Sequence, residues 1–191
     1  MTIDDIIRWV PTKNAEMMTT TGQSKRDVYE FFHKPEFADK IGVEFGCYQC
    51  HSTIVLAQCF KHVYALDNWA DAIAVGRKFL DSHGIDNVTI FHQELYNGSP
   101  LPIIECDAIL IDSKHTYDGV KIDVERALKL KSSGKKFFIL DDYGICPEIK
   151  RCVTDFCSAN VLKIVKFIGA PKDTPHNAPL YDWEGVICQE V

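Results

Sequence analysis

The chain has 191 residues, a formal net charge of −6 and 46% hydrophobic residues, values typical of one globular domain. The acidic balance argues against nucleic acid as the main partner, because a phosphate backbone selects basic surfaces. No apolar run approaches the ~20 residues of a membrane-spanning helix, and the opening residues are acidic where a secretory leader would be basic. We therefore expect a cytoplasmic protein that binds neither nucleic acid nor a membrane.

The first 39 residues are predicted to form a helical segment ahead of the main domain. A short amphipathic helix is predicted over 2–9. Residues 13–22 are polar and rich in threonine, which favours a surface connector over a substrate-facing flap. Ser24 is the predicted N-cap of a second helix, which Pro35 ends.

From residue 40 onward, short apolar runs alternate with helical patterns. The predicted strands are 40–45, 62–66, 88–91, 108–111, 137–140, 161–168 and 183–188. The predicted helices between them are 50–60, 70–83, 117–131 and 147–157. Strands separated by helices indicate a parallel sheet covered on both faces, a doubly wound α/β fold. The last two strands are joined without a helix, so we expect an antiparallel pair at one edge of this seven-stranded sheet.

The stretch from Ile41 to Ser52 reads as a strand, a tight turn and the start of a helix. Gly46 lies where the backbone must turn sharply, which a residue without Cβ allows at no steric cost. Such a turn presents backbone N–H groups to a nucleotide-like ligand. A dinucleotide enzyme normally needs three glycines at this turn, so the pattern argues against one.

Cys47 and Cys50 have the CxxC spacing that zinc sites and redox-active thiols share. A zinc ribbon needs a second pair, and Cys152 and Cys157 lack its spacing. Eight cysteines without a leader fit a reducing compartment. Zinc binding and redox chemistry stay open, and packed thiols are the interpretation we adopt.

Polar side chains follow several strands, at the edge where an open α/β sheet binds ligands. Asp67 lies about twenty residues beyond Gly46, where a carboxylate accepts hydrogen bonds from ribose hydroxyls. Its alternative role is the N-cap of the helix that begins near Trp69. Trp69 would cover an adenine face or pack as an ordinary core residue.

Asp112, Asp141 and Asp142 end neighbouring strands. Carboxylates that converge without basic partners repel one another, and a divalent cation such as Mg²⁺ removes that conflict. The alternative is that they serve as turn and N-cap residues. His115 follows Asp112 on the next loop, where its imidazole suits removal of a proton from a substrate hydroxyl. Lys114 is the alternative base.

The chain resembles a class I S-adenosylmethionine-dependent methyltransferase over residues 40–190. Within that superfamily it is similar to small-molecule O-methyltransferases of the macrocin, cephalosporin-hydroxylase-associated and catechol types. The most specific part is DAILIDSKHTYDGV at 107–120, followed by FILDDY at 138–143. The resemblance implies a Rossmann-like domain over 40–191, with 1–39 as a helical cap on the substrate side.

The resemblance also implies roles for individual residues. The reaction would be methyl transfer to a hydroxyl oxygen of a small molecule or sugar, with S-adenosylmethionine and Mg²⁺ as cofactors. The metal ligands would be Asp112, Asp141 and Asp142, and the catalytic residues His115, Asp112 and Lys114. The implied cofactor-binding residues are Glu44, Gly46, Cys47, Tyr48, Ser52, Asp67, Asn68, Trp69, Gln93 and Asp112. The oligomeric state, a homodimer included, stays open.

Two positions depart from the pattern of that family. Cys50 stands where a second glycine is usual, and a thiol there could crowd the methionine end of the cofactor. The turn at 132–134 is Ser-Ser-Gly where Pro-Gly-Gly is usual, a difference that we interpret as structural. The Cys50 departure keeps open a second hypothesis, a cofactor-binding module without catalysis that has a regulatory or partner role.

Overall fold

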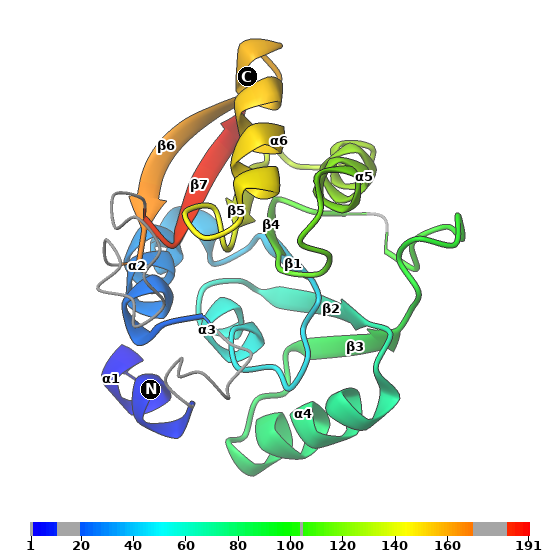
Figure 1. The fold of residues 1–191 in the computed structure, drawn as a ribbon. Coiled ribbons are helices and arrows are strands. Elements are labelled where there is room, and N and C mark those ends of the chain that lie inside the picture. Colours follow the sequence, from blue (N-terminus) through cyan, green and yellow to red (C-terminus); the bar gives the residue numbers. More distant parts are fainter. Residues whose placement is uncertain (1, 11–19, 104, 170–182) are drawn as a thin grey trace.

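The structure is a computed structural model that describes residues 2–10, 20–103, 105–169 and 183–191 (Figure 1). Its strands are β1 (Ile41–Phe45), β2 (His62–Asp67), β3 (Val88–His92), β4 (Ala108–Ile111), β5 (Phe137–Leu140), β6 (Leu162–Ile168) and β7 (Gly185–Glu190). Its helices are α1 (Ile3–Trp9), α2 (Gly22–Phe32), the 3₁₀ turn η1 (Pro35–Phe37), α3 (Thr53–Ala57), α4 (Ala70–Ser82), α5 (Tyr117–Leu128) and α6 (Pro147–Ser158).

The strands form one mixed sheet in the order β3-β2-β1-β4-β5-β7-β6. The pairs from β3 to β5 are parallel, and β7 is antiparallel to both of its neighbours, β5 and β6. This arrangement confirms the predicted Rossmann-like doubly wound fold with an antiparallel last strand. The hydrophobic runs are buried because helices cover both faces of the sheet (Figure 1).

The register of the central strands brings distant residues to one edge. Phe45 pairs with Leu66 on one side and with Ile111 on the other, and Ile111 pairs in turn with Leu140. The residues that follow these positions therefore lie side by side at this edge of the sheet. They are Gly46, Asp67, Asp112 and Asp141. The strand order reverses between β1 and β4, which is where such sheets bind ligands.

The N-terminal helices belong to the same core as the sheet. Ile6 of α1 and Phe32 of α2 are fully buried in a cluster that includes residues of α3 and α4. Helices α5 and α6 supply residues to the second cluster, on the other face. No helix in the described ranges has the length and apolar character needed to cross a membrane.

Two local predictions need correction. The N-cap of α2 is Thr21, whose hydroxyl accepts a hydrogen bond from the Ser24 backbone N–H; Ser24 itself lies inside the helix. Helix α3 spans Thr53–Ala57 rather than the predicted 50–60, and its later start follows from the left-handed backbone of Cys50, with φ of 64°. Most of the predicted connector at 13–22 lies outside the described residues.

Candidate active site

A cavity of about 890 Å³ opens at the carboxyl edge of the sheet. Most of the predicted site residues line it. These are Gly46, Tyr48, Asp67, Asn68, Trp69, Gln93, Asp112, Lys114, His115, Asp141 and Asp142. Glu44, Cys47 and Ser52 do not line it, and instead surround a small hollow beneath the glycine turn.

The glycine turn depends on Gly46 for steric reasons. Gly46 has φ of +85°, and a Cβ added there would lie 2.2 Å from the carbonyl oxygen of Asp112. No side chain fits in that gap, so β1 and β4 approach each other closely at the switch point. The Gly46 N–H donates to the carbonyl of Leu66, which ties the turn to the end of β2.

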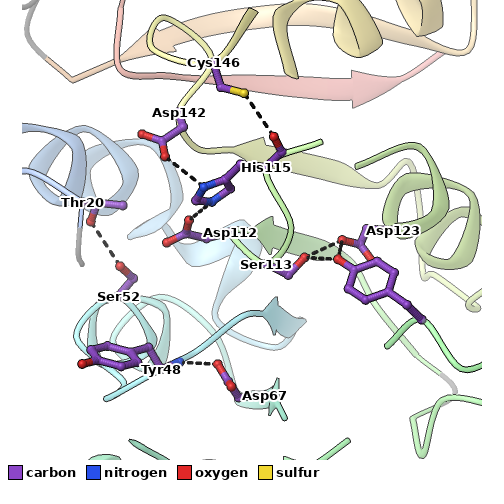
Figure 2. Close-up of polar contacts among 11 residues, drawn as sticks. Thr20, Tyr48, Ser52, Asp67, Asp112, Ser113, His115, Asp123, Asp142 and Cys146 are labelled. Carbon is purple, nitrogen blue, oxygen red and sulfur yellow. Dashed lines mark hydrogen bonds and ion pairs between the residues drawn. The ribbon is translucent and has the colours of Figure 1, made fainter. Parts of the chain in front are cut away.

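Asp67 shapes the loops on either side of it. Its Oδ2 accepts a hydrogen bond from the Tyr48 backbone N–H at 2.7 Å (Figure 2), and its Oδ1 accepts one from the Trp69 N–H at 2.8 Å. The carboxylate therefore fixes the glycine turn while it lines the cavity. Trp69 is 51% exposed and 5.4 Å from the Tyr48 ring, so it is a cavity residue rather than a core residue.

Glu44 and Ser52 support the turn from below. Glu44 is buried, and the Thr53 hydroxyl donates to its carboxyl group at 2.5 Å. Burial raises the pKa of Glu44 well above its usual value and so favours its neutral form. The Ser52 hydroxyl contacts the Thr20 hydroxyl at 3.1 Å, which links the turn to the N-terminal segment (Figure 2).

Cys50 does not crowd the cavity. It is fully buried, and its Sγ lies 2.7 Å from where a Cβ on Gly76 would be, so the thiol occupies space that a glycine of α4 leaves open. A hydrogen bond between the thiols of Cys47 and Cys50 raises the pKa of Cys47 and lowers that of Cys50. Within the described part of the chain, neither thiol belongs to a group that could hold a metal.

The far end of the cavity brings His115 between two carboxylates (Figure 2). Its Nε2 is 3.1 Å from Oδ1 of Asp112, and its Nδ1 is 3.6 Å from Oδ2 of Asp142. The ligand atoms of these three residues lie within 4.8 Å of one another. The carbonyl of His115 accepts a bond from the Cys146 thiol at 3.3 Å, which holds the loop against the segment after β5.

The sequence analysis missed Lys25, which lies in a hollow beside the site, and also Tyr96 and Ser113, which line the cavity itself. The Lys25 side chain is almost completely buried, and its Nζ donates to the Thr20 carbonyl and hydroxyl at 2.6 and 2.7 Å. Burial lowers the pKa of Lys25 to about 8, against an opposing effect of nearby carboxylates, of which Asp141 is the strongest. Lys25 and Asp141 line the same small hollow. The premise that the aspartates converge without a basic partner is therefore wrong for Asp141.

A sequence signal for Lys25 did exist. In a helix, position 25 lies on the same face as Val28 and Phe32, both of which are buried. A lysine on an apolar stripe either extends to solvent or pairs with buried charges. The sequence cannot tell which, because the partner carboxylate lies more than one hundred positions away, at Asp141.

Comparison with known proteins assigns the chain to a family. A family model described as "Methyltransferase domain" matches residues 43–143, which are 101 of the 191 residues. The chain belongs to this methyltransferase family. The match spans the glycine turn, Asp67 and the loop that carries Asp112 and His115. No curated protein sequence matches the chain.

Solved methyltransferase structures share the fold. The S-adenosylhomocysteine-bound methyltransferase PaMTH1 of Podospora anserina has a TM-score of 0.69 at 14% identity, with 98% of this chain and 86% of that chain covered. Precorrin-6y C5,15-methyltransferase of Geobacter metallireducens has a TM-score of 0.65 at 12% identity, with 94% and 95% covered. The tRNA (m1A58) methyltransferase TrmI of Aquifex aeolicus has a TM-score of 0.64 at 14% identity, with 100% and 76% covered. The chain therefore has the domain and the fold of an S-adenosylmethionine-dependent methyltransferase.

Proposed function

We propose that this methyltransferase transfers the methyl group to a hydroxyl oxygen of a small molecule or sugar. The observation that carries the proposal is the position of His115, in the same cavity as the glycine turn, with a carboxylate at each ring nitrogen. A hydroxyl group must lose its proton as its oxygen is methylated. An imidazole at this place can accept that proton, and Asp112 and Asp142 would stabilise the resulting imidazolium.

The cavity fits S-adenosylmethionine. The backbone of the Gly46 turn lines the cavity without a side chain, and Asp67 presents a carboxylate to the same space. We assign Asp67 to the ribose hydroxyls, and Trp69 and Gln93 to the adenine. Tyr48, Asn68 and Asp112 complete this wall, while Glu44, Cys47 and Ser52 support it from beneath. When bound, S-adenosylmethionine supplies a methyl group activated by the positive charge on its sulfur.

A divalent cation also fits the far end. Asp112, His115 and Asp142 together offer carboxylate and imidazole donors at mutual distances that one ion can span. A bound cation would lower the pKa of an acceptor hydroxyl. We propose Asp112 and Asp142 as its ligands. Asp141, expected from the sequence as a third ligand, lies beside Lys25, so the proposal uses it as a supporting charge.

His115 can serve as proton acceptor or as a third metal ligand, but one ring nitrogen cannot do both at once. Lys114 lines the same cavity, with its Nζ 5.0 Å from the centre of the Tyr96 ring, and is the proton acceptor that a metal-bound His115 would require. Measuring metal dependence and the effect of His115 substitution together separates these roles.

The acceptor is proposed to be small and hydroxylated rather than a nucleic acid. The net charge of −6 and the aspartates around the cavity would repel a phosphate backbone. Residues 1–39 are proposed as the substrate-side cap, since Thr20 contacts Ser52 of the turn and Lys25 of α2 lies beside Asp141. A cytoplasmic location and the choice between a monomer and a homodimer remain predictions.

The test is S-adenosylhomocysteine formation from S-adenosylmethionine with a panel of sugars, phenols and catechols. Each acceptor is assayed with Mg²⁺ and with a chelator. We expect His115→Gln to lower kcat by about 100-fold or more, as loss of a general base does. Asp118→Asn, an exposed change on the neighbouring helix, is the matched control.

Turnover of amine or RNA acceptors but of no hydroxylated compound would contradict the proposal. Binding of S-adenosylhomocysteine without turnover of any acceptor would instead favour the non-catalytic module. If chelation leaves the rate unchanged, the reaction does not need a cation, and the proposal keeps only His115 as the proton acceptor.

A further inference from the structure

Three side chains from separate elements meet behind one wall of the cofactor cavity. Tyr96 follows β3, Ser113 follows β4, and Asp123 lies in α5. The Tyr96 hydroxyl is 2.8 Å from Ser113 Oγ and 2.8 Å from Asp123 Oδ2, and Ser113 Oγ is 2.5 Å from the same Oδ2. Figure 2 shows Ser113 and Asp123 pointing toward each other, away from His115.

Asp123 does not touch the cavity itself. Its side chain is fully buried, whereas Tyr96 and Ser113 both line the cavity. Its second oxygen, Oδ1, has no hydrogen-bond partner among the described residues. Any effect of Asp123 on a bound ligand must therefore pass through Tyr96 and Ser113.

One oxygen of Asp123 accepts hydrogen bonds from both hydroxyls. The Tyr96 and Ser113 hydroxyls each donate to Oδ2, and their own oxygens are in hydrogen-bond contact with each other. Burial raises the pKa of Asp123, against the opposing effect of these two hydrogen bonds. A single carboxyl oxygen therefore holds both hydroxyls in place.

Helix α5 holds the loop after β3 at a second point. Arg126, one turn beyond Asp123, donates from its guanidinium to the carbonyls of Leu95 and Ser99. The loop is thus tied to α5 on both sides of Tyr96. Because Ser113 adjoins Asp112, the same helix also sets the position of the loop after β4.

We propose that Asp123 is a positioning residue for the cofactor. Through Tyr96 and Ser113 it sets the spacing of the two loops that form this wall of the S-adenosylmethionine cavity. A purely structural Asp123 would stabilise the fold without changing affinity for the cofactor. The proposal rests on the methyltransferase family and the cavity, and requires neither a particular acceptor nor a metal.

The test uses calorimetric titration of the full chain with S-adenosylhomocysteine. In Asp123→Asn the amide NH₂ can donate to both hydroxyls, which still bond to each other, so we expect affinity within about threefold of wild type. Asp123→Leu has a similar volume but no polar atoms, and should weaken binding by about tenfold or more.

Val124→Ala is the matched control, because Val124 is the next residue of α5 and is also fully buried. It should lower Tm without changing affinity for S-adenosylhomocysteine. The effect of Asp123→Leu should also shrink in a Ser113→Ala background, since the two residues act as one unit.

Wild-type affinity in folded Asp123→Leu would overturn the proposal. So would full additivity of Asp123→Leu with Ser113→Ala, or an equal loss of affinity in Val124→Ala. If Asp123→Leu does not fold, Tyr96→Phe removes one hydroxyl of the triangle and takes its place; an unchanged affinity there overturns the proposal. Failure to find a hydroxylated acceptor leaves this titration unaffected, so the two proposals fail separately.

Discussion

The two ends of the cavity are built from contacts of different range. The cofactor end, which comprises Gly46, Tyr48, Asp67 and Trp69, is held together within one β-α-β unit, and the Tyr48–Asp67 bond spans 19 positions. The histidine end, which comprises Asp112, His115, Asp141 and Asp142, is formed by the loops after β4 and β5, and Lys25 of α2 lines an adjacent hollow with Asp141. Local contacts can be anticipated from residue order, whereas the charge balance of the histidine end depends on packing.

The histidine end also depends on the two termini of the chain. The Thr21 backbone N–H donates to Glu184 at 2.9 Å, and its hydroxyl donates to the same carboxylate, across 163 positions. Asp27 of α2 accepts a bond from the Gly169 N–H at 2.9 Å. These hydrogen bonds hold α2 against the end of β6 and the start of β7. A substitution in either terminal segment can therefore change the position of Lys25 beside Asp141.

The largest expected effect is at the cofactor end. Gly46→Ala should destabilise the fold by about 3 kcal/mol or more and abolish measurable binding of S-adenosylhomocysteine, because the new Cβ would overlap the Asp112 backbone. Urea unfolding and calorimetry measure the two effects. Gly134→Ala, where a Cβ meets nothing within 4 Å, is the control and should change little. Normal binding in Gly46→Ala would show that the turn has another conformation.

Beside the histidine end, the burial of Lys25 should make the free energy of unfolding depend on pH. Burial lowers the pKa of Lys25 from 10.5 to about 8, so between these values the unfolded chain binds a proton that the folded chain does not. The free energy of unfolding should therefore rise with pH across this window, by up to about 3 kcal/mol relative to Lys25→Met.

Urea unfolding of both proteins across that window measures the difference, in which the ionisation of shared cysteines cancels. Lys163→Met, a change at an exposed lysine of β6, is the control, and its free energy of unfolding should vary with pH as that of wild type does. A difference between wild type and Lys25→Met that stays constant with pH would contradict a buried, depressed Lys25.

A smaller effect is expected from Asp67→Asn. The substitution leaves one oxygen for the two backbone N–H donors of Tyr48 and Trp69. The amide NH₂ then faces the N–H of Tyr48 or of Trp69, which loses its acceptor. We expect this loss to weaken binding of S-adenosylhomocysteine by about 30-fold, or about 2 kcal/mol. Asp71→Asn, an exposed change in the first turn of α4, is the control. Unchanged affinity would mean that Asp67 shapes neither the turn nor the cofactor site.

The smallest effect is expected at Cys50, although the sequence identified it as the weak point of the cofactor loop. Its thiol lies against Gly76, away from the cavity. Cys50→Ala should change affinity for S-adenosylhomocysteine by less than about twofold. Gly76→Ala should be more destabilising with Cys50 present than in the Cys50→Ala background. A tenfold change in affinity on removing the thiol would place it against the cofactor.

Much of the fold could be predicted because its signals are local. Apolar runs and helical periodicity located the strands and main helices, and the helix-free connection before β7 indicated its antiparallel direction. The polar residues after each strand were expected to meet, and most of them line one cavity. Thr21 replaced Ser24 as N-cap because both suit the role by type, and only backbone geometry distinguishes them.

The sequence by itself determined the doubly wound sheet, the sharp turn at Gly46 and the row of carboxylates at the strand ends, since each follows from residue type and nearest neighbours. Only the tertiary structure decided which carboxylate faces Lys25, where the Cys50 thiol points, and that Tyr96, Ser113 and Asp123 hydrogen-bond to one another. These contacts join elements far apart in the chain. Their geometry depends on strand register and helix packing, which residue order does not encode locally.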